Sequence, residues 1–141
     1  MLIDANVLLY AIINDYPQHA KSSAWLVRQL DGQRRVGIPW VNILAFIRIS
    51  TNRRMLAEPL SASDAWTAMM QLLDHPRVWI PTPGLEHRKI FTTLVRRYQP
   101  AGDLVMDLNL VALAQEHGLQ VVSTDSDFAR FPESRWLNPL I

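Results

Sequence analysis

Short apolar runs alternate with longer amphipathic stretches along the chain, and this pattern predicts alternating strands and helices. A buried strand needs only a few consecutive apolar residues, whereas an amphipathic helix repeats apolar positions at intervals of three and four. Turn residues such as Asp15, Pro17 and Gly32 separate the segments. We expect strands at residues 2–3, 36–38, 78–80 and 120–123, and helices at about 5–14, 18–30, 39–51, 63–74, 85–98 and 103–117.

Residues that begin and end helices support these boundaries. The segment Ser61–Asp64 supplies an N-cap for the helix that follows it, and Asp103 can cap another helix. Pro39 suits the first turn of a helix, whereas Pro76 prevents the helix before it from continuing. Gly118 is well placed to end the preceding helix in the left-handed conformation.

The alternation of elements predicts an α/β fold. Right-handed crossovers between the strands would give a parallel sheet with helices on both faces, in three α/β/α layers. No repeat or linker divides the 141 residues, and this length suits one compact core. We therefore expect a single domain over residues 1–141.

Composition narrows the class of protein. The chain is 49% hydrophobic and 19% charged, which argues against disorder, and its longest apolar run, residues 7–13, is too short to cross a membrane. There is no cysteine, which excludes disulfides, thiolate zinc sites and cysteine nucleophiles. No basic stretch of the kind that opens a secretory signal precedes the first apolar run. We expect a soluble cytoplasmic domain.

The basic residues are mostly arginines, although the formal net charge is only +1. Two of the 14 basic residues are lysines, and several arginines are adjacent, at 34–35, 53–54 and 96–97. A guanidinium binds phosphate through paired hydrogen bonds, whereas lysine acts as a point charge. Ordinary surface charge explains the bias more simply. By itself the bias is weak evidence for a nucleic-acid partner.

Aspartates follow the first and last expected strands directly. Asp4 comes after the first strand, and Asp125 and Asp127 come after the last. Open α/β sheets bind their ligands at the carboxyl ends of the strands, so these carboxylates are expected at one edge. Asp103 and Asp107 are four residues apart, which places them on one face of a helix that starts near the same edge.

Several carboxylates at one point repel each other, so either their pKa values rise or a cation holds them together. Mg²⁺ or Mn²⁺ fits, because such an ion takes carboxylate oxygens and leaves positions for water and phosphate. An ion of this kind can activate water for phosphodiester hydrolysis. The four histidines are scattered, which argues against zinc. Structural explanations stay open, with Asp103 as a helix cap and residues 124–128 as an Asx turn.

Three segments resemble the motifs of the PIN-domain ribonucleases. Residues 2–9, Leu-Ile-Asp-Ala-Asn-Val-Leu-Leu, are similar to the first strand of that family. Residues 107–117 resemble the helix of its third acid, and residues 123–128, Ser-Thr-Asp-Ser-Asp-Phe, resemble its final acidic strand end. Residues 39–52 and 138–140 match as well. Because the motifs keep their order and spacing over the full chain, the chain is most similar to VapC-type toxins of type II toxin–antitoxin modules.

The resemblance implies an endoribonuclease that depends on magnesium or manganese and cuts structured RNA. It also implies a VapB-type antitoxin that blocks the site, and a toxin homodimer. By position, Asp4, Asp107 and Asp125 would be catalytic metal ligands, and Asp127 would be an additional catalytic acid.

Further residues are candidates for accessory roles and RNA binding. Thr124 and Asn6 would help to position water or phosphate. Arg48, near the expected site, and the pair Arg53 and Arg54 would bind the RNA backbone. Tryptophan is enriched in interfaces, so some of the five tryptophans are expected to line a dimer or antitoxin groove, although core packing is the simpler explanation for any one of them.

The chain departs from the family pattern in one respect. The family carries a glutamate on the helix after the second strand, at the position that maps to Ala45, and residues 32–57 contain no acid. Losing a carboxylate lowers the charge that holds the ion and weakens metal affinity. Asp103 is a possible substitute because it faces the same way as Asp107, and Asn42 is a weaker, neutral candidate.

The sequence leaves two alternative functions to consider. The missing glutamate fits a catalytically weak or inactive PIN-like module that binds RNA or a protein, for which little metal binding and no cleavage are expected. A phosphoryl-transfer domain of the dehalogenase type also starts with a strand and an aspartate. That chemistry requires a second aspartate where Asn6 stands and a lysine near the last motif, and neither is present.

Overall fold

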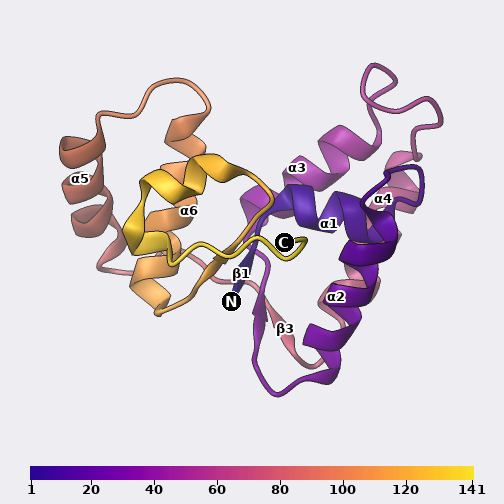
Figure 1. The fold of residues 1–141 in the computed structure, drawn as a ribbon, viewed down its shortest axis with the longest axis horizontal. Coiled ribbons are helices and arrows are strands. Elements are labelled where there is room, and N and C mark those ends of the chain that lie inside the picture. The colour runs from indigo at the N-terminus through magenta and orange to yellow at the C-terminus, as the bar shows by residue number, and fades with distance from the viewer.

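The computed structural model covers residues 1–141 and has a four-stranded parallel sheet between two groups of helices (Figure 1). Leu2 in the first strand pairs with Gly37 on one side and with Val121 on the other. The expected parallel α/β fold is confirmed. The strands lie in the order β3-β2-β1-β4 and comprise β1 (Leu2–Ile3), β2 (Val36–Gly37), β3 (Val78–Trp79) and β4 (Val121–Val122).

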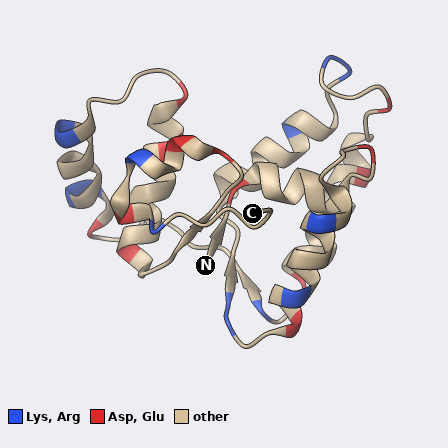
Figure 2. Ribbon diagram, viewed as in Figure 1, with Lys and Arg blue, Asp and Glu red and all other residues tan.

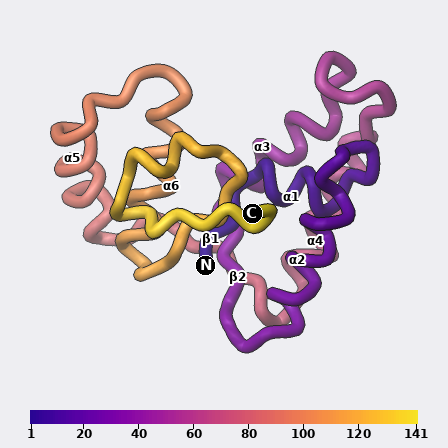
Figure 3. The backbone as a smooth tube through the Cα atoms, viewed as in Figure 1, coloured from indigo at the N-terminus to yellow at the C-terminus, as the bar shows by residue number.

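Four helices pack on one side of the sheet, and two helices with two short 3-10 helices pack on the other (Figures 1 and 3). The first group comprises α1 (Ala5–Ile12), α2 (His19–Asp31), α3 (Trp40–Ser50) and α4 (Ala62–Leu73). The second group comprises α5 (His87–Tyr98), α6 (Leu104–His117), η1 (Ser126–Arg130) and η2 (Pro132–Ser134). None of these helices combines the length and the apolar character needed to cross a membrane.

The sheet separates two apolar cores because successive strand residues point to opposite faces. Ile3 and Val122 belong to a core of 17 buried residues with the first group of helices. Their neighbours Leu2 and Val121 belong to a core of 11 buried residues with the second group. Short strands thus suffice at the centre of the sheet, because the residues of β1 and β4 are buried on one side or the other, whereas Val78 and Trp79 of the edge strand β3 are only half-buried.

The observed helices and strands differ from the expected ones mainly at their ends. α1 ends at Ile12, because Ile13 adopts an extended conformation with φ −97° and ψ 113°. α4 starts one residue early, where the Ser61 hydroxyl accepts a hydrogen bond from the Asp64 N–H at 3.0 Å. The Gly118 cap is confirmed by its φ of 66°. Asp103 occupies the N-cap position of α6 as expected, but its side chain accepts no hydrogen bond from the first turn of the helix.

The tryptophans divide between core and surface. Trp25 is buried in the larger core, as expected for a packing residue. Trp40 on α3 and Trp66 on α4 are exposed over 47% and 36% of their surface, and their rings stack 6.3 Å apart. The α3–α4 surface therefore carries exposed aromatic rings that contribute little to the core.

Candidate active site

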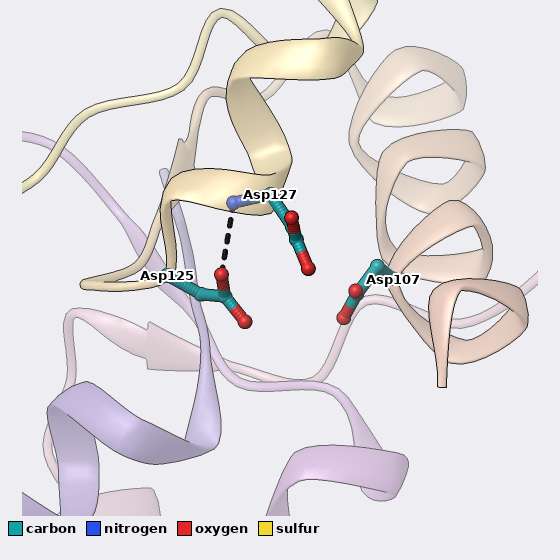
Figure 4. Close-up of side chains that lie close together, drawn as sticks. All are labelled: Asp107, Asp125 and Asp127. Atoms are coloured by element: carbon teal, nitrogen blue, oxygen red, sulfur yellow. Dashed lines mark hydrogen bonds between the residues drawn. The ribbon is translucent and has the colours of Figure 1, made fainter. Parts of the chain in front are cut away.

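Three carboxylates from two segments face one another beyond the carboxyl end of β4 (Figure 4). Asp107 lies near the start of α6, Asp125 follows β4, and Asp127 lies in η1. One oxygen of each carboxylate lies within 4.8 Å of the other two. An Asx turn joins two of them, since Asp125 Oδ1 accepts a hydrogen bond from the Asp127 N–H at 2.8 Å. The Asx turn that was the structural explanation for residues 124–128 is therefore present. It also brings Asp127 close to the other two acids.

Asp4 lies at the end of the neighbouring strand and is held by its own hydrogen bonds. The ladder between β1 and β4 continues to its N–H, which donates to the Val122 carbonyl at 2.9 Å. Its Oδ1 accepts from the Ala5 N–H at the start of α1, and its Oδ2 accepts from the Ser123 hydroxyl, both at 2.7 Å. Asp4 does not belong to the group of acids within 4.8 Å, although it lines the same cleft as Asp107.

The Ser123 hydroxyl links the two acidic strand ends. Its side chain is fully buried and accepts hydrogen bonds from Asn6 Nδ2 and from the Asp125 N–H, each at 3.0 Å, while it donates to Asp4. Asn6 Oδ1 also accepts from the Thr124 N–H at 3.3 Å. This role of Ser123 was not predicted from the sequence. A polar residue at the buried end of an apolar strand is the feature that could have identified it.

A cleft of about 490 Å³ opens between α3 and α6 beside these acids. Asp4, Asp103 and Asp107 line its acidic side, and Asn42, Ala45 and Arg48 line the side formed by α3. The structure thus brings Arg48 to the acids. Arg53 and Arg54 are exposed in the turn after α3 and do not line this cleft.

The lining of the cleft shows where the glutamate of the family pattern would lie and which residues could replace it. Ala45 is half-buried in its wall, so a glutamate at this position would join Asp4 and Asp107. Asp103 is exposed in the same cleft. Asn42 is buried, and its side-chain amide donates to the Ile3 carbonyl at 2.8 Å, so this amide fixes the end of β1.

The electrostatics of the site oppose the ionisation of two acids. Burial, together with the nearby carboxylates of Asp125, Asp4, Asp127 and Asp103, raises the pKa of Asp107 to about 6. Burial also raises the pKa of Asp4, although its hydrogen bonds from Ser123 and Ala5 act in the opposite direction. An adjacent cation would reverse both effects, because it favours the charged carboxylates.

The donor set fits a hard divalent cation. The three oxygens that meet are all carboxylate oxygens, which Mg²⁺ and Mn²⁺ prefer, and neither cysteine nor histidine is among them. Asp125 is exposed and Asp107 only half-buried, so solvent reaches the point where the oxygens converge. The arrangement can therefore hold an ion that keeps some of its water ligands.

Comparison with known proteins identifies a family and several full-length relatives. The sequence matches the family described as PIN domain over residues 1–134. Ribonuclease VapC37 of Mycobacterium tuberculosis is 38% identical over 138 residues, covering 98% of this chain and 96% of the relative. Ribonuclease VapC33 of the same organism is 36% identical over 137 residues, covering 97% of this chain and 96% of the relative.

Solved toxin structures share the fold at low sequence identity. VapBC2 from Rickettsia felis, solved bound to a DNA fragment from its promoter, aligns with a TM-score of 0.72 at 15% identity and covers 97% of this chain and 96% of its own. A toxin–antitoxin complex from Klebsiella pneumoniae aligns with a TM-score of 0.63 at 15% identity and covers 98% of this chain and 96% of its own. These alignments confirm the three-layer α/β/α arrangement.

Proposed function

The chain belongs to the PIN domain family, and on this premise we propose that it is an endoribonuclease toxin that cuts structured RNA with Mg²⁺ or Mn²⁺. One observation carries the proposal: the oxygens of Asp107, Asp125 and Asp127 converge within 4.8 Å at the carboxyl edge of the sheet. Relatives that are named ribonucleases and align over nearly the whole chain support the reaction class.

The acids would share the work of holding the ion. Asp107 and Asp125 would bind it directly, and Asp4 would join them from β1. When bound, the ion would lower the pKa of a water molecule and neutralise charge on the scissile phosphate. Asp127 would be the further catalytic acid, kept beside Asp125 by the Asx turn. These side chains are held on the ends of β1 and β4 and on α6, which keeps them in place for substrate.

The accessory residues would position water and phosphate. Thr124 donates its backbone N–H to Asn6, and its hydroxyl, which has no hydrogen-bond partner in the protein, would be free to bind a ligand. Asn6 in turn holds the loop after β4 through its hydrogen bond with Ser123. Arg48 would bind a phosphate of RNA in the cleft, and Arg53 with Arg54 would contact RNA beyond it.

A VapB-type antitoxin would neutralise the enzyme, and the toxin would form a homodimer. The antitoxin is supported by the solved complexes of structurally similar toxins. Exposed apolar side chains on α3 and α4, among them Trp40, Leu44 and Trp66, suit an amphipathic partner helix. Of these side chains Leu44 also lines the acidic cleft, so a partner bound to it would restrict access for RNA.

The test is a paired measurement on protein freed of antitoxin. We would titrate Mg²⁺ and Mn²⁺ calorimetrically and incubate the same preparations with total bacterial RNA. Metal binding and discrete cleavage are expected for the wild type, and both should be lost in Asp4→Asn. Asp74→Asn is the matched control, because Asp74 is exposed at the end of α4 and outside the cleft.

The other outcome distinguishes the second function. A wild-type protein that binds no metal and cuts no RNA would contradict the nuclease and favour the PIN-like binding module. If cleavage is found, Asp103→Asn asks whether this cleft carboxylate replaces the missing glutamate. In that case metal affinity should fall clearly more than in Asp74→Asn.

A further inference from the structure

Three arginines surround a depression at the end of the sheet opposite the acids. Arg34 and Arg35 lie just before β2, and Arg135 follows η2. Together with Gln120, which precedes β4, they line a pocket of about 530 Å³, which we call the amino-edge pocket. Figure 2 shows the basic segment of the loop that leads into β2, at the opposite end of the strands from the acidic edge.

Two of the three guanidinium groups are already fixed. The Arg35 guanidinium carbon lies 4.4 Å from the centre of the Trp79 ring, which is a cation–π contact. Arg135 donates from Nη2 to the Gly118 carbonyl at 2.8 Å and has other N–H groups left. Arg77 holds the loop itself, since its Nη1 donates to the Gln33 carbonyl at 2.8 Å. A ligand would therefore meet cations that need little ordering, which favours binding.

No carboxylate balances these charges. The lining of the amino-edge pocket contains no acid, and none of the three ion pairs in the chain involves its arginines. α6 ends at this point with its carbonyl groups, which explains Arg135 as a partner of the helix end. That partial charge does not account for Arg34 and Arg35. Like charges gathered in a concave site attract an anion.

Because the active-site cleft is acidic, an RNA substrate needs cationic contacts on other parts of the surface. Asp4, Asp103 and Asp107 line that cleft with Arg48 as the only cation, so the cleft repels a polyanion until a metal binds. An RNA substrate must gain attraction at other points of the surface. The amino-edge pocket and the acids lie at opposite ends of β1, about 10 Å apart through the buried sheet at ~3.3 Å per residue. Because β1 is buried, an RNA that reaches both must follow a longer path around the covering helices.

We propose that the amino-edge pocket binds a phosphate of the RNA backbone and so provides a second contact for an RNA whose scissile bond lies in the acidic cleft. This inference rests on the proposed function for the identity of the ligand. It assigns Arg34, Arg35 and Arg135 to phosphate binding, and none of them to the reaction itself.

The test measures RNA binding in the absence of metal, so that binding is separated from cleavage. A fluorescent RNA oligonucleotide is titrated in EDTA at several salt concentrations with the wild type, Arg34→Gln, Arg34→Gln/Arg35→Gln and the control Arg88→Gln. Arg34 and Arg88 are both exposed and unpaired, but Arg88 lies on α5 outside the described pockets. Loss of the phosphate contact should weaken binding by up to about fivefold at ~0.1 M salt and reduce the salt slope by up to about 0.7, partly in Arg34→Gln and more fully in the double variant.

A second readout locates the contact. The Nε–H resonances of Arg35 and Arg135 should shift on addition of RNA, and the resonance of Arg88 should not. Thermal unfolding of each variant checks that the fold is intact. Inorganic phosphate at matched ionic strength should compete only weakly, and strong competition would assign the pocket to a free anion.

The results separate this inference from the proposed function. Equal RNA affinity and salt slope for Arg34→Gln, the double variant and the wild type would overturn the phosphate site, even if the protein cuts RNA. An absence of RNA binding in the wild type would overturn it as well. Cleavage that requires Asp4 but not the arginines would leave the nuclease in place and remove only this second contact.

Discussion

The Ser123 hydroxyl is fully buried and is hydrogen-bonded to three residues at the acidic edge, Asp4, Asn6 and Asp125. Two of these partners, Asp4 and Asp125, are proposed metal ligands that follow different strands. One side chain thus fixes the distance between β1 and the loop after β4 at the point where that distance matters. Buried polar groups that lose a partner are costly, because water does not replace the lost hydrogen bond.

We expect Ser123→Ala to lower the free energy of unfolding by about 1–3 kcal/mol, because it leaves three polar groups without their partner. Affinity for Mg²⁺ should fall as well, since Asp4 and Asp125 lose a common anchor. Urea unfolding and calorimetry measure the two effects. Ser126→Ala is the control, because Ser126 is exposed in η1. Unchanged metal affinity in Ser123→Ala would show that the acids keep their positions without the hydroxyl.

Asp107 makes the stability of the metal-free protein depend on pH. Its pKa of about 6 in the folded chain is above the ordinary aspartate value of 3.8, so the folded state binds the additional proton between these values. The free energy of unfolding should therefore fall as pH rises from about 4 to 6, and the effect of the charged carboxylate is complete above pH 6. Because Asp107 is only half-buried, we expect about 1 kcal/mol after allowance for solvent screening.

Asp107→Asn should remove this dependence. In EDTA the variant should unfold at a higher temperature than the wild type at pH 7, and the difference should vanish near pH 4. Thermal unfolding over this pH range, with Asp74→Asn alongside, measures the effect. A variant less stable than the wild type at pH 7 would mean that the Asp107 carboxylate stabilises the metal-free fold.

At the scale of elements, the sequence predicted those features that depend on local chemistry. The apolar pattern and Gly118 located α6, and the aspartates after β1 and β4 predicted a shared acidic edge, since parallel strands end together. The two 3-10 helices were not predicted. Their position depends on tertiary packing, because Phe128 and Phe131 are buried in the smaller core without helical periodicity around them.

The arrangement of the side chains at the acidic edge could not be predicted from the sequence. Sequence position could not indicate that Ser123 and Ala5 hold the Asp4 carboxylate, or that Asp4 lies outside the three acids that meet within 4.8 Å. These are distances between side chains on different elements. Spacing along the chain specifies an edge of the sheet, but hydrogen bonds across the strands decide which oxygens converge.

The end of α6 offers a test of an element boundary. Gly118 has φ 66°, and a Cβ atom added there would meet nothing within 4 Å, so only backbone conformation opposes a side chain. We expect Gly118→Ala to lower the free energy of unfolding by about 1 kcal/mol. Gly118→Asn should lose less, because asparagine tolerates this conformation. Equal losses in urea unfolding would indicate a cause other than the backbone.

At the scale of the whole molecule, the proposed metal site joins parts that pack in different cores. α6, with Asp107, packs in the smaller core, while α1, which follows Asp4, packs in the larger core on the other face of the sheet. Asp125 follows β4, the strand that pairs with β1. An ion bound by all three acids would stabilise the fold as a unit, since these positions separate when the chain unfolds.

Mg²⁺ should therefore raise the unfolding temperature of the wild type in a concentration-dependent way. At a free concentration of ~100 times Kd the stabilisation should be about 2.7 kcal/mol, because the ion binds only the folded state. EDTA should reverse the shift, and NaCl at the same ionic strength should not reproduce it. Asp125→Asn should show a much smaller shift, whereas Asp74→Asn should respond as the wild type does. An equal shift in Asp125→Asn would place the bound ion elsewhere on the molecule, and the acids at the sheet edge would then need another explanation.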